Sequence, residues 1–459
     1  MRTYLKVVGL VILSIMVFTA CGPQETVVPT EVVSESTEAE PEPTEAAPEP
    51  TEAAPEPTEA EPVPSATVEV WLLPAANFLE AHEVINGRFA QAHPEITVEQ
   101  VEVPWEQYPA KLAAAFSSGD VPDVIEGVTP WMINYAKAGR LAPVSDSVYT
   151  ADEIKEAFYS ACADATLWQG VYYGLPLNYN LEFTPVAIYN VAMAEEQGFN
   201  TDFATLEEYL EALQQATVTD SAGNIIISGD DVYPGQGRYP ASRFMTYLVQ
   251  FGGSYMNEDR SAFTINTDAG RRSLQLMVDL VEKYEVDDPA LGGEDSFRRE
   301  EAAFINIGPW FARILDIDFP DLEYSNTIVP SAGEGDPVFL TLLNWGLFVP
   351  ADSENQESAW TYIDFFFEEE NLLEWNLKAG EIPAHVELSQ DPNFTDDPFL
   401  GKYVEVLPYG RVLGDVGNMD EFFNILNDMV GRALLEDMSV DDALAEGEER
   451  LNTMLANYR

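Results

Sequence analysis

Three tryptophans stand beside glycine or proline at places where strands are expected to end. Trp131 follows Pro130, Trp310 follows Gly308-Pro309, and Trp345 precedes Gly346. A core tryptophan normally belongs to a periodic helix or strand, whereas one beside a Gly or Pro turn is more typical of a surface or cleft. Its indole offers a flat apolar face for stacking and one N–H donor. Together the three tryptophans indicate an aromatic-lined cleft that binds a ligand.

The elements that must position these residues alternate between strand and helix. Residues 68–72, 96–103 and 121–125 are expected strands. Between them, two sets of apolar residues fall on helical faces, namely Phe78, His82, Ile85 and Phe89, and then Trp105, Tyr108, Leu112 and Phe116. Pro94 and Gly119 are expected to end these helices. Such a repeat predicts an α/β layer with parallel strands.

A second set of elements follows from about residue 205. Thr205 and Glu208 predict a capped helix, residues 303–307 read as a buried strand that Gly308-Pro309 breaks, and Ser439 opens a C-terminal helix. Ligands of open α/β sheets bind beyond the carboxyl ends of the strands. The segments after Leu73, Ile125, Ile307 and Leu343 are therefore the expected ligand loops, and three of the four carry one of the tryptophans.

Charge excludes several classes of partner. The chain has a net charge of −58, and residues 67–459 hold 68 acidic and 20 basic residues. Such a field repels nucleic acid and anionic lipid, so we expect neither as a partner, and a solvated acidic surface is the simplest interpretation. Cys162 is an expected buried side chain. The histidines are scattered, and His82 lacks the second histidine of a zinc motif, so we expect no metal or cofactor.

The N-terminus has the form of a secretory signal. Arg2 and Lys6 precede an apolar run over residues 7–19, which is shorter than the ~20 residues that span a bilayer. Residues 1–21 end at Cys21, which resembles the lipidated cysteine of bacterial lipoproteins. An ordinary signal cleaved near Ala20, with Cys21 incidental, is the alternative. Residues 22–66 lack lysine and arginine and repeat Pro-Glu-Pro-Thr-Glu-Ala-Ala, so we expect a disordered, extended tether.

Motifs over essentially all of residues 67–459 resemble the extracellular solute-binding proteins of ABC importers, specifically the large carbohydrate-binding family that includes maltose-binding protein. The motifs occur in the order of that family: 89–98, Phe116-Ser-Ser-Gly-Asp-Val-Pro-Asp-Val124, Gly170-Val-Tyr-Tyr-Gly-Leu-Pro176, 188–190, 297–310 and 374–384.

The resemblance implies a type II periplasmic-binding-protein fold, an α/β architecture of two discontinuous lobes that close on a solute bound between them. The first lobe would comprise residues 67–180 and 331–381, and the second residues 181–330 and 382–459. It also implies a monomer on the extracytoplasmic face of the membrane that delivers a sugar to membrane permease subunits and has no catalytic residue.

The resemblance also implies a ligand site. Trp310 matches the stacking position of the family, Asn344 and Trp345 come next, and the family pattern adds Asn77, Glu126, Trp131, Tyr179 and Asn180. Arg238 and Tyr239 would come from a loop of the second lobe, and Arg411 would be a donor to sugar hydroxyls, although a surface ion pair is an equal explanation for both arginines.

Two other functions remain open at this stage. The binding protein could take a non-sugar solute, because an acidic chain with aromatic residues also suits a compatible solute or an amine. A tethered glycoside hydrolase would need a specific pair of carboxylates. Among 68 acidic residues, adjacent pairs occur by chance, so the sequence favours binding over catalysis.

Overall fold

The computed structural model describes residues 66–181, 184–231, 239–288, 291, 293–341, 344–436 and 438–458. The strands form two five-stranded sheets and two smaller pairs. The first sheet contains β1 (Ala66–Leu72), β2 (Ile96–Glu102), β3 (Val124–Val128), β6 (Leu175–Pro176) and β13 (Trp345–Phe348). The second contains β7 (Val186–Asn190), β8 (Val218–Thr219), β9 (Ile225–Asp230), β10 (Ala302–Ile305) and β11 (Tyr324–Ile328). The smaller pairs are β4 (Leu167–Trp168) with β5 (Val171–Tyr172), and β12 (Phe339–Thr341) with β14 (Gly410–Val412).

The first sheet has the strand order β2-β1-β3-β13-β6. β1 pairs in parallel with both β2 and β3, as the sequence predicts, whereas β13 is antiparallel to β3. The carboxyl ends of β1, β2 and β3 therefore lie at one edge, and β13 begins at that same edge. Trp345 pairs with Val128 and is the first residue of β13. Our expectation that Trp345 lies in a turn after a strand was wrong on this point.

The second sheet has the order β11-β7-β10-β9-β8. β10 is parallel to β9 and antiparallel to β7. The strand expected over residues 303–307 is β10, which ends at Ile305. The two sheets draw their strands from the two sides of the expected lobe division, while the exact lobe boundaries stay a prediction.

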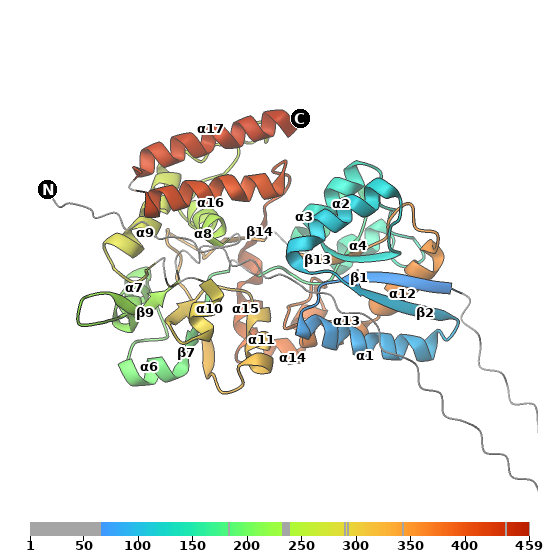
Figure 1. Ribbon diagram of the computed structural model, residues 1–459, viewed down its shortest axis with the longest axis horizontal. Coiled ribbons are helices and arrows are strands. Elements are labelled where there is room, and N and C mark those ends of the chain that lie inside the picture. The colour runs from blue at the N-terminus through green and yellow to red at the C-terminus, as the bar shows by residue number, and fades with distance from the viewer. Residues whose placement is uncertain are drawn as a thin grey trace, which may run out of the picture. The chain divides into compact units, whose positions relative to one another are not determined.

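Helices flank both sheets. They are α1 (Ala76–Ala92), α2 (Tyr108–Ser118), α3 (Thr129–Lys137), α4 (Ala151–Ala157), α5 (Ser160–Ala163), α6 (Val191–Gln197), α7 (Leu206–Ala216), α8 (Tyr239–Gln250), α9 (Asp268–Glu282), α10 (Gly293–Arg298), α11 (Trp310–Asp318), α12 (Gln356–Phe366), α13 (Glu369–Ala379), α14 (Pro392–Thr395), α15 (Leu400–Val406), α16 (Met419–Leu435) and α17 (Val440–Tyr458). Short 3-10 turns are η1 (Trp105–Gln107), η2 (Asp164–Thr166), η3 (Leu388–Gln390) and η4 (Leu407–Tyr409). α1 and α13 run side by side next to β1 and β2 (Figure 1).

Local chemistry explains the predicted helices. The face of α1 that carries Phe78, His82, Ile85 and Phe89 is buried, and α1 ends before Pro94. Gly119 closes α2 with φ of +80°, a conformation that costs glycine little. The side chain of Thr205 accepts a hydrogen bond from the Glu208 N–H at 3.2 Å and so caps α7.

Two neighbouring segments connect the sheets. Residues 177–180 follow β6, and residues 382–384 run beside them through two backbone hydrogen bonds, from Tyr179 N to Ile382 O at 2.7 Å and from Ala384 N to Leu177 O at 3.3 Å. Tyr179 is buried and packs under Gly410, where any side chain would meet the Tyr179 ring. These paired crossings hold the two α/β halves next to each other.

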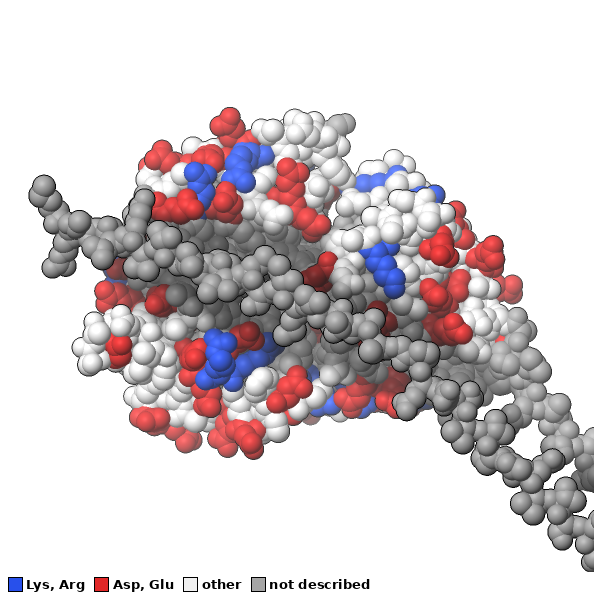
Figure 2. All heavy atoms as spheres, viewed as in Figure 1, with Lys and Arg blue, Asp and Glu red and all other residues white. Residues whose placement is uncertain are grey.

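Most buried apolar residues form one large core, and a smaller cluster around Ile305, Phe311 and Leu315 supports α11. Within the described residues, the helices are all too short or too polar to cross a membrane. On the face drawn in Figure 2, acidic side chains are scattered over the described surface and far outnumber basic ones. The expected signal peptide, the lipidated Cys21, residues 22–65 of the tether and Arg238 lie outside the described residues. The expected tether bound of residue 66 was one residue too long, because Ala66 pairs with Ile96 as the first residue of β1.

Candidate functional site

Three indole rings meet at the edge of the first sheet where β1, β2 and β3 end. The rings of Trp105 and Trp131 lie 4.6 Å apart between centroids, and the edge of Trp345 contacts Trp105 at 6.0 Å. Phe78, near the start of α1, adds an edge contact to Trp345 at 5.2 Å. The structure thus brings Trp131 and Trp345 of the first lobe together through an intervening ring.

Trp105 was absent from the predicted site. Trp131 and Trp345 are each only 8% exposed because neighbouring rings cover them, whereas Trp105 is half-buried. Sequence reasoning placed Trp105 on a helical face and overlooked that it follows Pro104, directly after β2. The rule that singled out the other three tryptophans would have found it.

Asn344 organises the backbone beneath these rings. Its Oδ1 accepts hydrogen bonds from Asn180 N at 2.9 Å and from Thr341 Oγ1 at 3.3 Å, and the Cys162 thiol lies 3.7 Å away. Asn178 Oδ1 likewise accepts from Trp345 N at 2.7 Å. Asn344 and Asn180 are both buried. The hydrogen bond from the backbone N–H of Asn180 to the side-chain oxygen of Asn344 therefore joins the crossing segment to the residue that precedes β13. Burial raises the pKa of the Cys162 thiol, which stays protonated.

A pocket of about 280 Å³ lies next to this asparagine junction. α3 and the β4–β5 hairpin line one side, residues 412–417 and Met419 line the other, and Thr341 and Asn344 lie between them. Its volume is at the low end for small-molecule sites, which suits one or two small rings. Trp168 provides an aromatic wall that sequence reasoning missed, because the hairpin belongs to neither large sheet. The Trp168-Gln169-Gly170 sequence carried the same signal of an indole beside glycine.

Lys137 is one of the residues that line this pocket. Its Nζ lies 2.8 Å from Asp415 Oδ2 and 3.2 Å from the hydroxyl of Tyr458, which itself donates to Asn134 Oδ1 at 3.0 Å. Burial opposes the charge of Lys137, but the hydrogen bonds to Asp415 and Tyr458 outweigh it and raise its pKa. Burial likewise opposes the charge of Asp415, and its hydrogen bond from Lys137 holds the pKa low. The lining of the pocket therefore includes an ionised, hydrogen-bonding pair.

Trp310 stands at the start of α11, on the helix that follows β10 of the second sheet. It is half-buried against the smaller apolar cluster, with the Phe311 ring at 5.8 Å. Its backbone approaches Gly380, which follows α13 beside the first sheet. Asn77 Nδ2 donates to Ala379 O at 2.7 Å, so Asn77 and Trp310 both lie against the 379–380 turn. Asn77 is buried, and its Oδ1 has no hydrogen-bond partner among the described residues.

Replacing Gly380 with alanine is expected to separate α11 from α13. Gly380 has φ of +72°, and an added Cβ would lie 2.8 Å from Arg313 Cβ and 3.2 Å from Trp310 Cα. Strained backbone and overpacking together should cost about 1–3 kcal/mol of unfolding free energy. Urea unfolding measures the loss, with Gly139→Ala as the control, because Gly139 has a similar φ and open space around its Cα. Equal losses at both positions would contradict the close approach.

Glu126 was predicted to contact ligand, and the structure gives it a different environment. Its side chain is fully buried, and Oε2 pairs with His82 Nε2 at 3.1 Å. The Tyr362 hydroxyl lies on the other side of His82, 3.4 Å from Nδ1. Glu126 points toward His82 of α1, on the face of the first sheet that this helix covers. We therefore leave Glu126 out of the ligand set.

The remaining predicted residues have distinct places. Arg411 is exposed in β14, where its Nη1 donates to the carbonyl oxygens of Pro408 and Gly410 at 3.0 and 2.8 Å. Tyr239 is the half-buried first residue of α8. Burial raises the pKa of the Tyr179 phenol, which is therefore neutral and structural. Among the described residues, no group of three His, Cys, Asp or Glu side chains is arranged to hold a metal.

These features define a two-lobe α/β binding protein. A solute-binding protein from Thermotoga lettingae, solved with α-D-tagatose, has this fold: it superimposes with a TM-score of 0.72 at 22% identity, covering 85% of this chain and all of that one. The expected fold class is confirmed.

The family model described as "Bacterial extracellular solute-binding protein" matches residues 87–401, which is more than half of the chain, and this chain belongs to that family. The maltotriose-binding protein of Pyrococcus abyssi is 21% identical over 358 residues, 76% of this chain and 73% of that protein. The arabinooligosaccharide-binding protein of Halalkalibacterium halodurans is 24% identical over 312 residues, 64% of this chain and 65% of that protein. Membership of this family implies a solute-binding role outside the cytoplasm.

Proposed function

We propose that this chain is a lipid-anchored binding protein that captures a sugar or oligosaccharide outside the cytoplasm and delivers it to the permease of an ABC importer. The observation that carries the proposal is the three-indole cluster of Trp105, Trp131 and Trp345 at the ligand edge of the first sheet. The names of similar proteins support the same class, since they specify maltotriose, arabinooligosaccharides and tagatose.

The chemistry of a sugar fits the two kinds of surface at this site. A sugar ring has an apolar face of C–H groups, which stacks on indole, and a rim of hydroxyls, which both donate and accept hydrogen bonds. The apolar face of a sugar ring could stack on the indole rings at the edge of the first sheet, on Trp168 in the pocket or on Trp310 of α11. The polar groups of Asn134, Lys137 and Asp415 suit the rim.

The predicted site residues divide into contact and support. We propose direct contact for Trp310, Arg411, Arg238 and Tyr239, whereas Trp131 and Trp345, each 8% exposed, reach the ligand only with the small part of the ring that neighbouring rings leave uncovered. Asn77, Asn344, Asn180 and Tyr179 are buried, so we propose that they hold the surrounding backbone in place. The ligand contacts both lobes only when they close, so it shifts the population toward the closed form by its differential affinity. Micromolar affinity, ~8 kcal/mol, is the expected scale.

We propose that Cys21 carries the lipid and that residues 22–65 tether the binding domain, which acts as a monomer beside the permease. Cys21→Ala tests the anchor. The wild-type chain is expected in the membrane fraction of a bacterial host that processes lipoproteins, and the variant in the soluble extracytoplasmic fraction. A variant that stays in the membrane fraction would contradict lipidation at Cys21.

Thermal unfolding of the full chain with a panel of solutes tests the ligand class. The panel contains maltotriose, arabinotriose and tagatose, with glycine betaine and spermidine as the non-sugar alternatives. A solute at about 100 times its Kd stabilises the folded state by about 2.7 kcal/mol, which raises the midpoint by several degrees. A shift with spermidine or betaine alone would overturn the carbohydrate assignment.

A further inference from the structure

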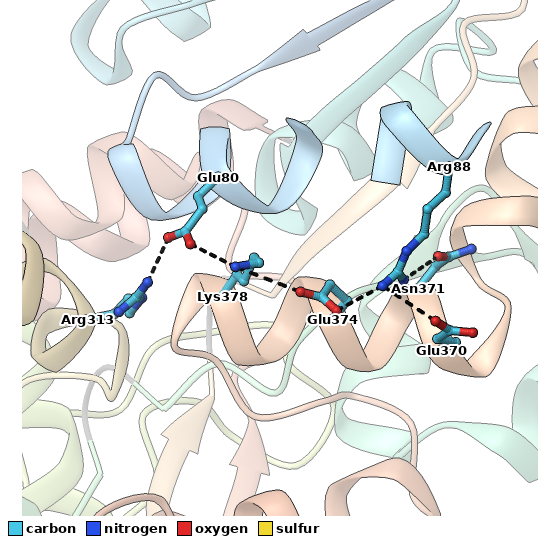
Figure 3. Close-up of polar contacts among 7 residues, drawn as sticks. All are labelled: Glu80, Arg88, Arg313, Glu370, Asn371, Glu374 and Lys378. Atoms are coloured by element: carbon cyan, nitrogen blue, oxygen red, sulfur yellow. Dashed lines mark hydrogen bonds and ion pairs between the residues drawn. The ribbon is translucent and has the colours of Figure 1, made fainter. Parts of the chain in front are cut away.

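The carboxylate of Glu80 links helix α1, beside the first sheet, to helix α11, which follows a strand of the second sheet. Glu80 on α1 lies between two cations, with Oε1 2.7 Å from Lys378 Nζ and Oε2 2.7 Å from Arg313 Nη2 (Figure 3). Each oxygen therefore has its own charged partner. The hydrogen bond from Lys378, and next that from Arg313, hold the pKa of Glu80 below its usual value against the effect of burial.

The two cations, Lys378 and Arg313, belong to different lobes. Lys378 is on α13, which packs along α1 on the first sheet. Arg313 is on α11, which follows β10 of the second sheet and packs its Phe311 and Leu315 into the smaller apolar cluster. The Glu80–Arg313 pair thus crosses between the lobes, whereas the Glu80–Lys378 pair stays within one.

The crossing pair acts on the helix that presents Trp310. Arg313 lies three residues after Trp310, almost one helical turn further along α11. A groove of about 920 Å³ opens beside the pair, lined by Glu374 and Lys378 from one side and by Pro309 and Arg313 from the other. The helices are therefore not sealed by continuous apolar packing along this groove, and the ion pair contributes to the position of α11.

We propose that Glu80 is a positioning residue for solute capture, because its bridge to Arg313 holds the Trp310-bearing helix α11 against α1 when the lobes are closed on the solute. This inference rests on the proposed function. When the lobes open, Glu80 keeps Lys378 as a partner, so the crossing pair can break without leaving a bare carboxylate. The Glu80 and Arg313 side chains are 37% and 31% exposed, which places the pair within reach of solvent ions.

Glu80→Gln tests the bridge, and Glu374→Gln is its matched control. Glu374 is in the same cluster and pairs with Arg88 at 3.1 Å and Lys378 at 3.8 Å, both on the first-lobe side (Figure 3). Both substitutions remove one negative charge from the same group of residues. Only Glu80→Gln removes a contact with α11.

The first readout needs no ligand. Hydrogen–deuterium exchange of the full chain is expected to speed up about three- to fivefold in residues 311–318 for Glu80→Gln, the factor expected when a partly exposed ion pair is lost. Glu374→Gln is expected to leave this peptide unchanged. Unchanged exchange in Glu80→Gln, or an equal increase in both variants, would overturn the positioning role whatever the chain binds.

The second readout is calorimetric titration with maltotriose. Glu80→Gln is expected to raise the Kd about three- to fivefold, and Glu80→Gln/Arg313→Gln is expected to bind no more weakly than the single variant.

The salt dependence of binding gives a third readout. Raising salt from about 0.1 M to about 1 M, which shortens the screening length from ~10 to ~3 Å, should weaken wild-type binding and leave binding by Glu80→Gln almost unchanged. Equal salt dependence of wild type and Glu80→Gln would contradict the bridge. Failure of the wild-type chain to bind maltotriose would count against the proposed function for that sugar, while the exchange experiment would still decide the bridge.

Discussion

Trp310→Ala is expected to weaken carbohydrate binding about 100-fold while the chain stays folded. Removal of a central aromatic anchor costs about 2–4 kcal/mol of binding free energy, because its stacking face and the water it excludes are both lost. Trp310 is half-buried at the start of α11, so most of the apolar support for the helix comes from Phe311 and Leu315 instead. Calorimetric titration with maltotriose measures the affinity, and circular dichroism checks the fold.

Two further variants sharpen this test. Trp310→Phe keeps an aromatic face and is expected to recover most of the affinity. Trp168→Ala removes the aromatic wall of the 280 Å³ pocket and so tests whether the same solute reaches that side. Unchanged affinity in Trp310→Ala would reject the stacking role, and a loss confined to Trp168→Ala would place the sugar in the pocket alone.

Sequence reasoning was most successful where the pattern is local. The order of β1, α1, β2, α2 and β3 follows from apolar spacing and from turn residues such as Pro94 and Gly119. These signals act within a few residues of one another, so they survive without knowledge of the tertiary fold. The motif order supplied the fold class, which the comparisons confirm.

The candidate site was harder to predict because burial depends on distant partners. Glu126 follows a predicted strand end, yet it pairs with His82, which lies 44 residues earlier. Asn344 binds the backbone of Asn180, 164 residues away, and so serves the crossing segments. Spacing along the sequence gives no sign of which face of a strand a side chain occupies until the strand register is known.

The exposure of the tryptophans was also hard to predict, because it too depends on distant partners. Trp345 was correctly singled out, but pairing with Val128 places it in β13, where neighbouring rings cover it. Trp105 and Trp168 were overlooked because one begins a short 3-10 turn and the other lies in a small hairpin. Glycine and proline therefore identified a region rich in indoles, whereas the exposure of each ring follows from tertiary packing.

Arg243→Met is expected to destabilise the fold by about 3–5 kcal/mol, the cost of leaving a buried charge without its partner. The guanidinium binds Asp230 through two hydrogen bonds of 2.7 and 3.2 Å, and the two side chains are only 9% and 1% exposed. A third hydrogen bond of 2.8 Å reaches Asn306 Oδ1. Burial opposes the charge of Arg243, but Asp230 outweighs it and raises the pKa, so the arginine is charged at any pH where the protein folds.

Because of where the Arg243–Asp230 pair lies, its loss should weaken the second sheet in particular. Asp230 ends β9, and Asn306 follows β10 and donates to Val186 O at 3.0 Å, so one arginine ties together three strands of the second sheet. Asn306 is also four residues before Trp310. Thermal unfolding should show a midpoint about 4–6 °C lower. Arg271→Met is the control, because Arg271 pairs with Asp441 at an exposed position and should cost under ~1 kcal/mol.

The double variant Asp230→Asn/Arg243→Met separates charge from packing. It removes both charges, so it should recover part of the stability that Arg243→Met loses. If the double variant is no more stable than Arg243→Met, the cost lies in the lost contacts with Asn306 and the strand ends instead of in the bare carboxylate. Equal small losses in Arg243→Met and Arg271→Met would contradict a buried ion pair at this position, because an exposed pair and a desolvated one differ several-fold in what they contribute.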